Sequence, residues 1–196
     1  MQTKQEREYQ MPCLYSLSDL LGLLVFSRKY HFLHNDLDCL IVAWAEAQVT
    51  RGNDSETLLI LASLGLDNQP ERNEVELYLS RYMAEQRIEL PSLKTAALVW
   101  IRLFISELSR CATIHDAKQK MYILVCHWFE PDVKIFEAMV DTLKSLYWHL
   151  FDEWVGPGTS EAAKMEESEF FWLINRAMLP YSRKIENPDW LDLLVR

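Results

Sequence analysis

Five side chains that can ligate a metal ion occur between positions 31 and 39, namely His31, His34, Asp36, Asp38 and Cys39. Imidazole and carboxylate groups that converge would suit zinc, iron or manganese. The spacing matches no standard metal site, and the two histidines lie on either side of a predicted turn. The two aspartates also stand where negative charge stabilises the start of a helix. The pattern therefore favours a helix start over a metal centre.

A second candidate for metal chemistry is the pair His115-Asp116. Adjacent His and Asp residues on helices resemble the core of the HD phosphohydrolase pattern, in which separated His and Asp residues complete a metal site. The resemblance implies a metal-dependent hydrolase, with His34 as the earlier ligand and Asp141 as the later one. Asp116 also fits an ordinary position at the start of a helix, so the hydrolase is kept as an alternative function.

Cys126 and His127 place a thiol beside a base, as nucleophilic catalysis requires. Neighbouring side chains on a helix point about 100° apart, so these two groups cannot pair directly. Cys126 is more simply expected in the core. The chain also contains no glycine-rich phosphate loop, no Gly-x-Ser-x-Gly elbow and no His-Glu-x-x-His motif. We therefore expect no catalytic residue and no cofactor.

The composition indicates which elements must position these residues. The chain has 196 residues, of which 49% are hydrophobic, with only 5 glycines and 7 prolines. Few chain breakers favour long helices with short connections, and this length can bury a substantial core. The sequence predicts an all-α, compact bundle of about seven to nine helices. We expect a single domain over residues 1–196, with a subdivision near 91–92 and a turn at 156–158 as its natural interruptions.

Apolar spacing and capping signals place the expected helices. The segment 96–106 is apolar or small except for Arg102, which predicts a central helix with neighbours on several sides. From Asp132 onward, steps of three and four predict the seam of an antiparallel bundle helix, and a wide seam could also join two copies in a homodimer. The expected helices span about residues 19–26, 35–52, 53–65, 70–87, 92–111, 116–128, 132–154 and 159–179.

Two local features of these helices follow from residue type. Gly65 comes directly after an apolar run and is expected to end that helix in a left-handed conformation. Phe170, Phe171 and Trp172 are expected to anchor the last helix in the core, while the acidic residues before them stay in water.

The charge balance bears on the class of partner. The formal net charge is −9 and the sequence pI is about 5.1. Such a field repels phosphate backbones, so nucleic acid is a poor direct ligand. The same field would attract a basic protein and speed its encounter with this surface.

Other features indicate the compartment. The N-terminal residues 1–11 are polar and lack the apolar stretch of a secretory signal, and the apolar run around Arg102 is shorter than the roughly 20 residues that span a bilayer. The four cysteines include no Cys-x-x-Cys pair. In a chain of this size they are expected to be reduced core thiols. We therefore expect a cytoplasmic protein that does not contact a membrane.

Part of the sequence resembles a class of bacterial proteins. The stretch Trp44–Pro91 contains Trp-Ala-Glu-Ala, Gly52, Asp54-Ser55-Glu56, Leu-Ala-Ser-Leu-Gly, Glu74-Val75-Glu76 and Ile88-Glu89-Leu90-Pro91. It resembles small acidic all-helical bacterial proteins, some of which are immunity proteins that neutralise toxins. The resemblance covers about a quarter of the chain and carries no active-site residue. It implies an inhibitor that binds and occludes a cognate toxin with a basic cleft.

A surface for such a partner is suggested by exposed aromatic and acidic residues. With Tyr147 and Leu150 facing inward, Trp148 is expected to project toward a flank beside Lys144. At that flank the side chain is either packed under another helix or exposed and bordered by charge, which would make it a binding hot spot. A helical adaptor or chaperone and the HD-type hydrolase are the alternatives to an inhibitor. The predicted partner-binding residues are Trp148, Phe151, Asp152, Glu153, Glu161, Glu166, Glu167 and Glu169.

Overall fold

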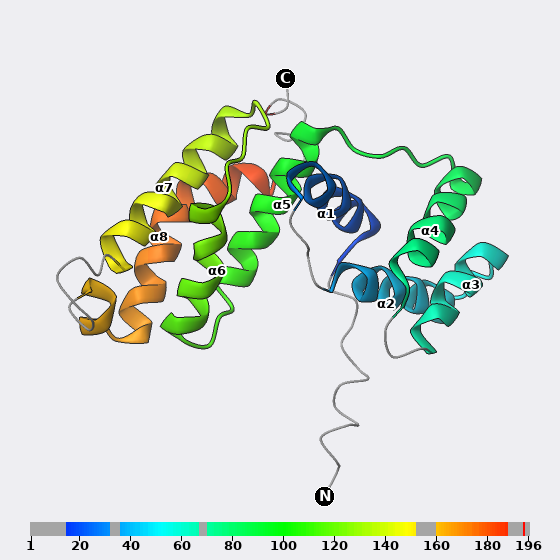
Figure 1. Cartoon of the computed structure of the whole chain (residues 1–196), viewed down its shortest axis with the longest axis horizontal. Helices are drawn as coiled ribbons and strands as arrows, with labels where there is room; N and C mark the ends of the chain where they lie inside the picture. The colour runs from blue at the N-terminus through cyan, green and yellow to red at the C-terminus, as the bar shows by residue number, and fades with distance from the viewer. Residues whose placement is uncertain (1–14, 32–35, 67–69, 152–159, 188–193, 195–196) are drawn as a thin grey trace, which may run out of the picture. The chain divides into compact units, whose positions relative to one another are not determined.

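The computed structural model describes residues 15–31, 36–66, 70–151, 160–187 and 194. Within these ranges the chain forms eight α-helices and two short 3-10 helices without any strand (Figure 1). The expected all-α class and number of helices are confirmed. The chain divides into two compact units, Met1–Pro91 (unit 1) and Ser92–Arg196 (unit 2). A single domain over residues 1–196 stays a prediction.

Unit 1 contains four α-helices and one 3-10 turn, which are α1 (Leu17–Tyr30), α2 (Leu37–Thr50), α3 (Glu56–Ser63), η2 (Leu64–Leu66) and α4 (Arg72–Gln86). Helix α3 packs against both α2 and α4, and α1 packs against α2. Trp44 and Tyr82 meet across the α2–α4 contact, with ring centroids 5.6 Å apart. The fully buried side chains of this core are Leu20, Leu23, Phe26, Ile41, Leu58, Leu61, Val75 and Leu79.

Serine side chains decide where α1 and α3 begin. Ser16 Oγ accepts a hydrogen bond from the Asp19 backbone N–H at 3.2 Å, and Asp19 Oδ2 accepts one from the Ser16 N–H at 2.9 Å. This capping box starts α1 ahead of the expected residue 19. Ser55 caps α3 by accepting from the Leu58 N–H, although Asn53 was the expected cap. In both helices the cap is the serine whose side-chain oxygen accepts a hydrogen bond from the backbone N–H three residues later, in the first turn.

Gly65 is required by close packing and not by a left-handed backbone. A Cβ atom at this position would lie 2.3 Å from Glu46 Oε1 and 2.8 Å from Val42 Cγ1 on α2. The backbone φ of Gly65 is outside the left-handed region, which Gly52 occupies with a φ of 93°. The expected left-handed ending at Gly65 was therefore wrong. The chain instead continues as η2, and the missing side chain lets this turn approach α2.

Glu76 on α4 pairs with Arg28 on α1 and with Arg72 one turn earlier on α4 itself. Its Oε2 atom lies 2.8 Å from Arg28 Nη2, and its Oε1 atom lies 3.0 Å from Arg72 Nε. Burial acts to raise the pKa of Glu76, but hydrogen bonds and charge from the two guanidinium groups outweigh it and leave this pKa below its usual value.

We expect Glu76→Gln to lower the free energy of unfolding by roughly 0.5–1 kcal/mol near neutral pH, as for other partly exposed ion pairs. Because the folded-state pKa is lowered, the carboxylate stabilises the fold at any pH above its usual pKa of 4.5, and this contribution is lost as the pH falls through the lowered pKa of the folded state. Urea unfolding of both proteins should give free energies that converge toward about pH 3. An equal difference at neutral and acidic pH would contradict this assignment.

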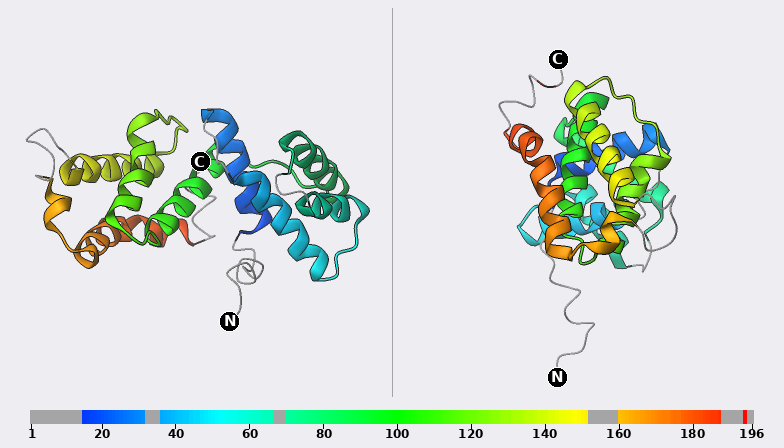
Figure 2. Two further views of the ribbon diagram at one scale, coloured as in Figure 1. Left: turned by 60° about the horizontal axis from the view of Figure 1, so that its bottom comes forward. Right: turned by 90° about the vertical axis from the view of Figure 1, so that its left-hand side faces the viewer.

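Unit 2 contains four α-helices and one 3-10 turn, which are α5 (Leu93–Leu108), α6 (Ile114–Cys126), α7 (Lys134–Phe151), η3 (Glu161–Lys164) and α8 (Glu167–Ile185). Ser92 caps α5 by accepting from the Thr95 N–H at 3.1 Å, as the sequence predicts. Helix α7 packs against α6, α8 and η3. The turn η3 lies between the C-terminal end of α7 and the N-terminal end of α8 (Figure 2).

Two helices of unit 2 follow the expected apolar patterns. Helix α5 buries side chains around most of its circumference from Ala96 to Leu108, as expected for the segment around Arg102. The α7 seam is confirmed from Val133 to Leu150, while Trp154 lies outside the described residues. The buried side chains of α7 are Phe136, Met139, Val140, Leu143, Tyr147, Leu150 and Phe151.

Helix α8 differs from the expected last helix at both ends. Ser160 precedes η3, and α8 itself begins after Glu166. The helix continues past Pro180 because Met178 and Ile185 are buried on either side of it, which offsets the hydrogen bond that proline cannot donate. Within the described ranges, no helix combines the length and apolarity needed to cross a lipid bilayer.

The expected aromatic anchor of α8 is only partly correct. Phe170 is fully buried, Phe171 is half-buried and Trp172 is 56% exposed. The inward stripe consists of residues 170, 174 and 178, which recur every four positions, and Trp172 is about 200° around the helix from Phe170. Arg176 lies over the exposed Trp172 ring, 4.9 Å from its centroid.

Candidate protein-binding surface

Three large aromatic side chains are exposed on α6, on α7 and on the segment between them. Trp128 is 77% exposed, Trp148 is 52% exposed and Tyr122 is 51% exposed. Exposed apolar side chains that stand singly are normal on a protein, whereas adjoining ones mark a binding surface. The contacts of these three side chains therefore show whether they form one surface.

Ring contacts through Tyr147 link Tyr122 and Trp148, and a separate contact links Trp128 to Lys144 of the same helix α7. Tyr122 and Tyr147 have ring centroids 6.2 Å apart, and Tyr147 meets Trp148 edge to face at 5.5 Å. Lys144 is one turn before Trp148 on α7, and its Nζ atom lies 5.5 Å from the centroid of the Trp128 ring. We call these five residues, Tyr122, Trp128, Lys144, Tyr147 and Trp148, the α6–α7 aromatic surface. Tyr147 is buried and supports the exposed members from below.

The local structure explains why the two tryptophans face outward. Because the buried stripe of α7 includes Leu143 and Tyr147, the opposite face of this helix presents Asp141 and Trp148. Trp128 follows α6, and the next residue, Phe129, is buried 5.2 Å from the Trp100 ring. This anchor turns Trp128 to the other side of the chain. The Trp128 Nε1–H donates to Glu130 Oε1 at 2.6 Å, which holds the indole in place.

Of the two alternatives for Trp148, exposure and packing under another helix, the structure shows exposure, whereas the exposure of Tyr122 and Trp128 was not predicted from the sequence. Tyr122 could have been found, since the inward residues of α6 are Ala117, Met121 and Leu124, and the tyrosine falls outside that stripe. No periodic signal exists for Trp128, because it lies beyond the end of α6.

The predicted acidic residues are exposed at the start of α8 and in η3. We call Glu161, Glu166, Glu167 and Glu169 the acidic segment; all four are exposed. Glu161 Oε1 pairs with Lys164 Nζ at 2.7 Å, and this hydrogen bond, with the lysine charge, lowers the pKa of Glu161. Glu166 is the cap of α8, and Glu167 and Glu169 lie in its first turn. Negative charge at this end of a helix also stabilises the helix itself.

Of the remaining predicted surface residues, the structure describes only Phe151, and its side chain is buried. Phe151 is 7% exposed and lies between the rings of Tyr147 and Phe170, at 5.2 and 5.8 Å. It therefore belongs to the core of unit 2, because the buried stripe of α7 includes Phe151, its last residue. Asp152 and Glu153 lie outside the described residues.

The described residues of the hydrolase alternative, His115, Asp116 and Asp141, do not form a metal-binding group. His115 and Asp116 are exposed at the start of α6, where Asp116 Oδ2 accepts from Thr113 Oγ1 at 2.8 Å and thereby completes a cap. Asp141 is exposed on the outer face of α7, and His34 lies outside the described residues. Among the residues that the structure describes, no three His, Cys, Asp or Glu side chains are grouped to hold a metal ion.

The first candidate cluster forms the junction of α1 and α2. His31 ends α1 with a φ of 53°, and Asp36 precedes α2, as the interpretation as a helix start predicts. Burial raises the pKa of Asp38, with Arg72 opposing and Glu76 adding to the shift. Burial and the charges of the two aspartates raise the pKa of the Cys39 thiol. Such a thiol is less reactive than a free cysteine.

The expectation of buried cysteines was wrong for two of the described positions. Cys39 and Cys126 are exposed and Cys111 is half-buried, while Cys13 lies outside the described residues. Cys126 faces outward with Tyr122, one turn earlier on α6, and the hydrogen bond between them raises the pKa of the tyrosine. His127 Nδ1 lies 3.1 Å from the Ile123 carbonyl oxygen. Cys126 and His127 therefore bond to different groups, Cys126 to Tyr122 and His127 to the Ile123 carbonyl oxygen.

The chain matches no protein-family model, and comparisons with curated proteins and with solved structures find no match either.

Proposed function

We propose that this protein binds another protein through the α6–α7 aromatic surface and the acidic segment of unit 2, and that the partner is basic. The specific form we propose is an immunity-type inhibitor that occludes the cleft of a cognate toxin. The observation that carries the proposal is the group of two tryptophans and one tyrosine exposed together around Lys144. Tryptophan and tyrosine are the residue types that most often dominate the binding energy of protein interfaces.

The chemistry of this surface favours a cationic partner. Lys144 lies over the Trp128 ring, so this exposed indole already accepts a cation on its face. Glu161 of the acidic segment lies near the C-terminal end of α7, since α7 contacts η3 and His149 acts electrostatically on Glu161, and the other three carboxylates follow at the start of α8. Exposed aromatic rings and carboxylates on the same unit suit lysine and arginine side chains.

The first test identifies the partner and then reverses the charge of the acidic segment. The whole chain, used as bait in its native host, should retain one dominant basic protein in near-equal amounts. An adaptor or chaperone would instead retain several proteins. We expect the variant Glu166→Lys with Glu167→Lys to bind this partner about tenfold more weakly, with a smaller dependence on salt. Affinity is measured by calorimetry at two salt concentrations.

A matched control comes from unit 1. Glu71 and Glu74 are exposed at the start of α4, as Glu166 and Glu167 are at the start of α8. The variant Glu71→Lys with Glu74→Lys makes the same change of charge in the first turn of a helix, so its cost for the helix dipole is similar. It should bind the partner as the unmodified protein does. Equal weakening by both variants would show that net charge, and not this surface, attracts the partner.

A further inference from the structure

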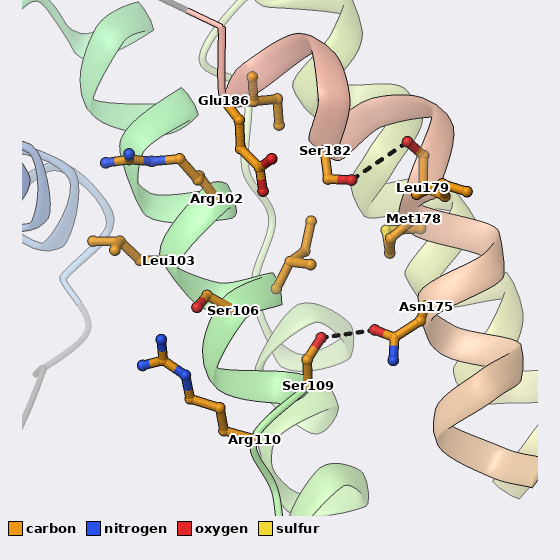
Figure 3. A pocket seen from close by; sticks show the side chains of 12 residues that line it. Arg102, Leu103, Ser106, Ser109, Arg110, Asn175, Met178, Leu179, Ser182 and Glu186 are labelled. Carbon is orange, nitrogen blue, oxygen red and sulfur yellow. Dashed lines mark hydrogen bonds between the residues drawn. The ribbon is translucent and has the colours of Figure 1, made fainter. Parts of the chain in front are cut away.

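A groove of about 550 Å³ lies between α5 and α8 of unit 2, apart from the α6–α7 aromatic surface (Figure 3). Its apolar wall contains Ile105 and Met178, which are buried, and Leu179, which is nearly half exposed. Its size is in the range of sites that enclose a small ligand or a single side chain.

Polar groups line the rest of the groove. Ser109 Oγ donates to Asn175 Oδ1 at 2.8 Å across the two helices, and Ser182 Oγ donates to the Leu179 carbonyl oxygen at 3.3 Å. The Glu186 carboxylate is directed into the space between α5 and α8, as Figure 3 shows. Arg102 and Arg110 also border the groove, but their guanidinium groups point away from α8. The charge that faces the groove is therefore negative.

Glu186 stands where negative charge is unfavourable for the helix. It is the C-terminal cap of α8, and the unpaired carbonyl groups at that end already carry a partial negative charge. Among the residues that the structure describes, no lysine or arginine pairs with its carboxylate. Glu186 is exposed, so its carboxylate is open to a cation that enters the groove. Such a cation would meet both the carboxylate and the carbonyl groups at the end of α8.

We propose that the α5–α8 groove binds one lysine side chain of the partner protein. The four-carbon stem packs against Ile105, Met178 and Leu179, and the ammonium group reaches the Glu186 carboxylate and the C-terminal carbonyl groups of α8. This inference rests on the proposed function, because it names a side chain that the basic partner inserts.

The probe for the groove is hexylammonium, which copies an aliphatic stem with an ammonium head. In the NMR spectrum of the whole 15N-labelled chain, hexylammonium should shift the backbone amides of residues 102–110 and 175–186 and saturate with a Kd on the order of 1 mM. Hexanoate has a similar stem and the opposite charge, and it should leave these amides unchanged at the same concentration.

Two variants test whether hexylammonium binds at Glu186 or is attracted only by the net negative charge of the chain. Glu186→Gln should weaken hexylammonium binding at least about tenfold, whereas Glu167→Gln, at the other end of α8, should not change it. The groove assignment is overturned if hexanoate shifts the same amides, if Glu186→Gln binds as before, or if no amide shifts. Failure of the proposed function gives a different result, since hexylammonium would still bind in the groove while no basic partner is retained.

Discussion

Phe136→Ala is expected to lower the free energy of unfolding by about 3–5 kcal/mol, the range for removing a fully buried aromatic ring. Phe136 has no exposed surface and is in contact with two other aromatic side chains of unit 2. Its ring centroid lies 6.1 Å from that of Trp100 and 6.3 Å from that of Phe129. Alanine would leave a cavity beside both rings, because helices α5 and α7 are held apart by their other side chains. Urea unfolding followed by tryptophan fluorescence measures the loss.

The variant Phe136→Leu serves as the control for this core. Leucine keeps most of the apolar volume, so we expect it to recover more than half of the stability that alanine loses. A loss below about 1 kcal/mol for Phe136→Ala would mean that the three rings do not form a closed core.

The helices of this protein could be predicted from the sequence because each depends on local regularities. The α7 seam recurs at three and four positions from Val133 to Leu150, which fixes both the helix and its buried face. Ser92 marks the start of α5, because its side chain accepts a hydrogen bond from the backbone N–H of Thr95 in the first turn. Both signals involve residues within a few positions of one another, so they do not depend on the tertiary arrangement.

The errors occur where tertiary contacts decide the outcome. Gly65 has the residue type of a left-handed cap, but its surroundings include Val42 and Glu46, about twenty positions earlier. Pro180 is a helix breaker by type, yet burial of Met178 and Ile185 keeps α8 intact. In both cases the local preference is weaker than the packing that opposes it.

The candidate site was only partly predictable for the same reason. The exposure of Trp148 follows from the spacing of α7, since a residue opposite a buried stripe must face outward. Trp128 lies in a connection, where no period relates one residue to the next, and its exposure depends on the burial of Phe129 against Trp100. Its pairing with Lys144 joins residues sixteen positions apart. A sequence pattern can therefore propose single exposed aromatic residues, but only the fold can join them into a surface.

Replacing both exposed tryptophans of the α6–α7 aromatic surface should weaken partner binding about 100-fold, which corresponds to about 2.7 kcal/mol. Trp128 and Trp148 are each more than half exposed in the free protein, so their removal leaves no cavity in the core. We expect the double variant Trp128→Ala with Trp148→Ala to unfold at nearly the same urea concentration as the unmodified protein. Calorimetric titration with the partner identified by the bait experiment measures the affinity.

The control is the double variant Leu66→Ala with Leu77→Ala, because both side chains are exposed apolar groups of unit 1 and belong neither to the α6–α7 aromatic surface nor to the acidic segment. A general effect of lost exposed apolar area would appear in both double variants. We expect the control to change the affinity less than about threefold, since residues outside a hot spot contribute little. If it weakened binding as much as the tryptophan variant, the assignment of the docking site to α6 and α7 would be wrong.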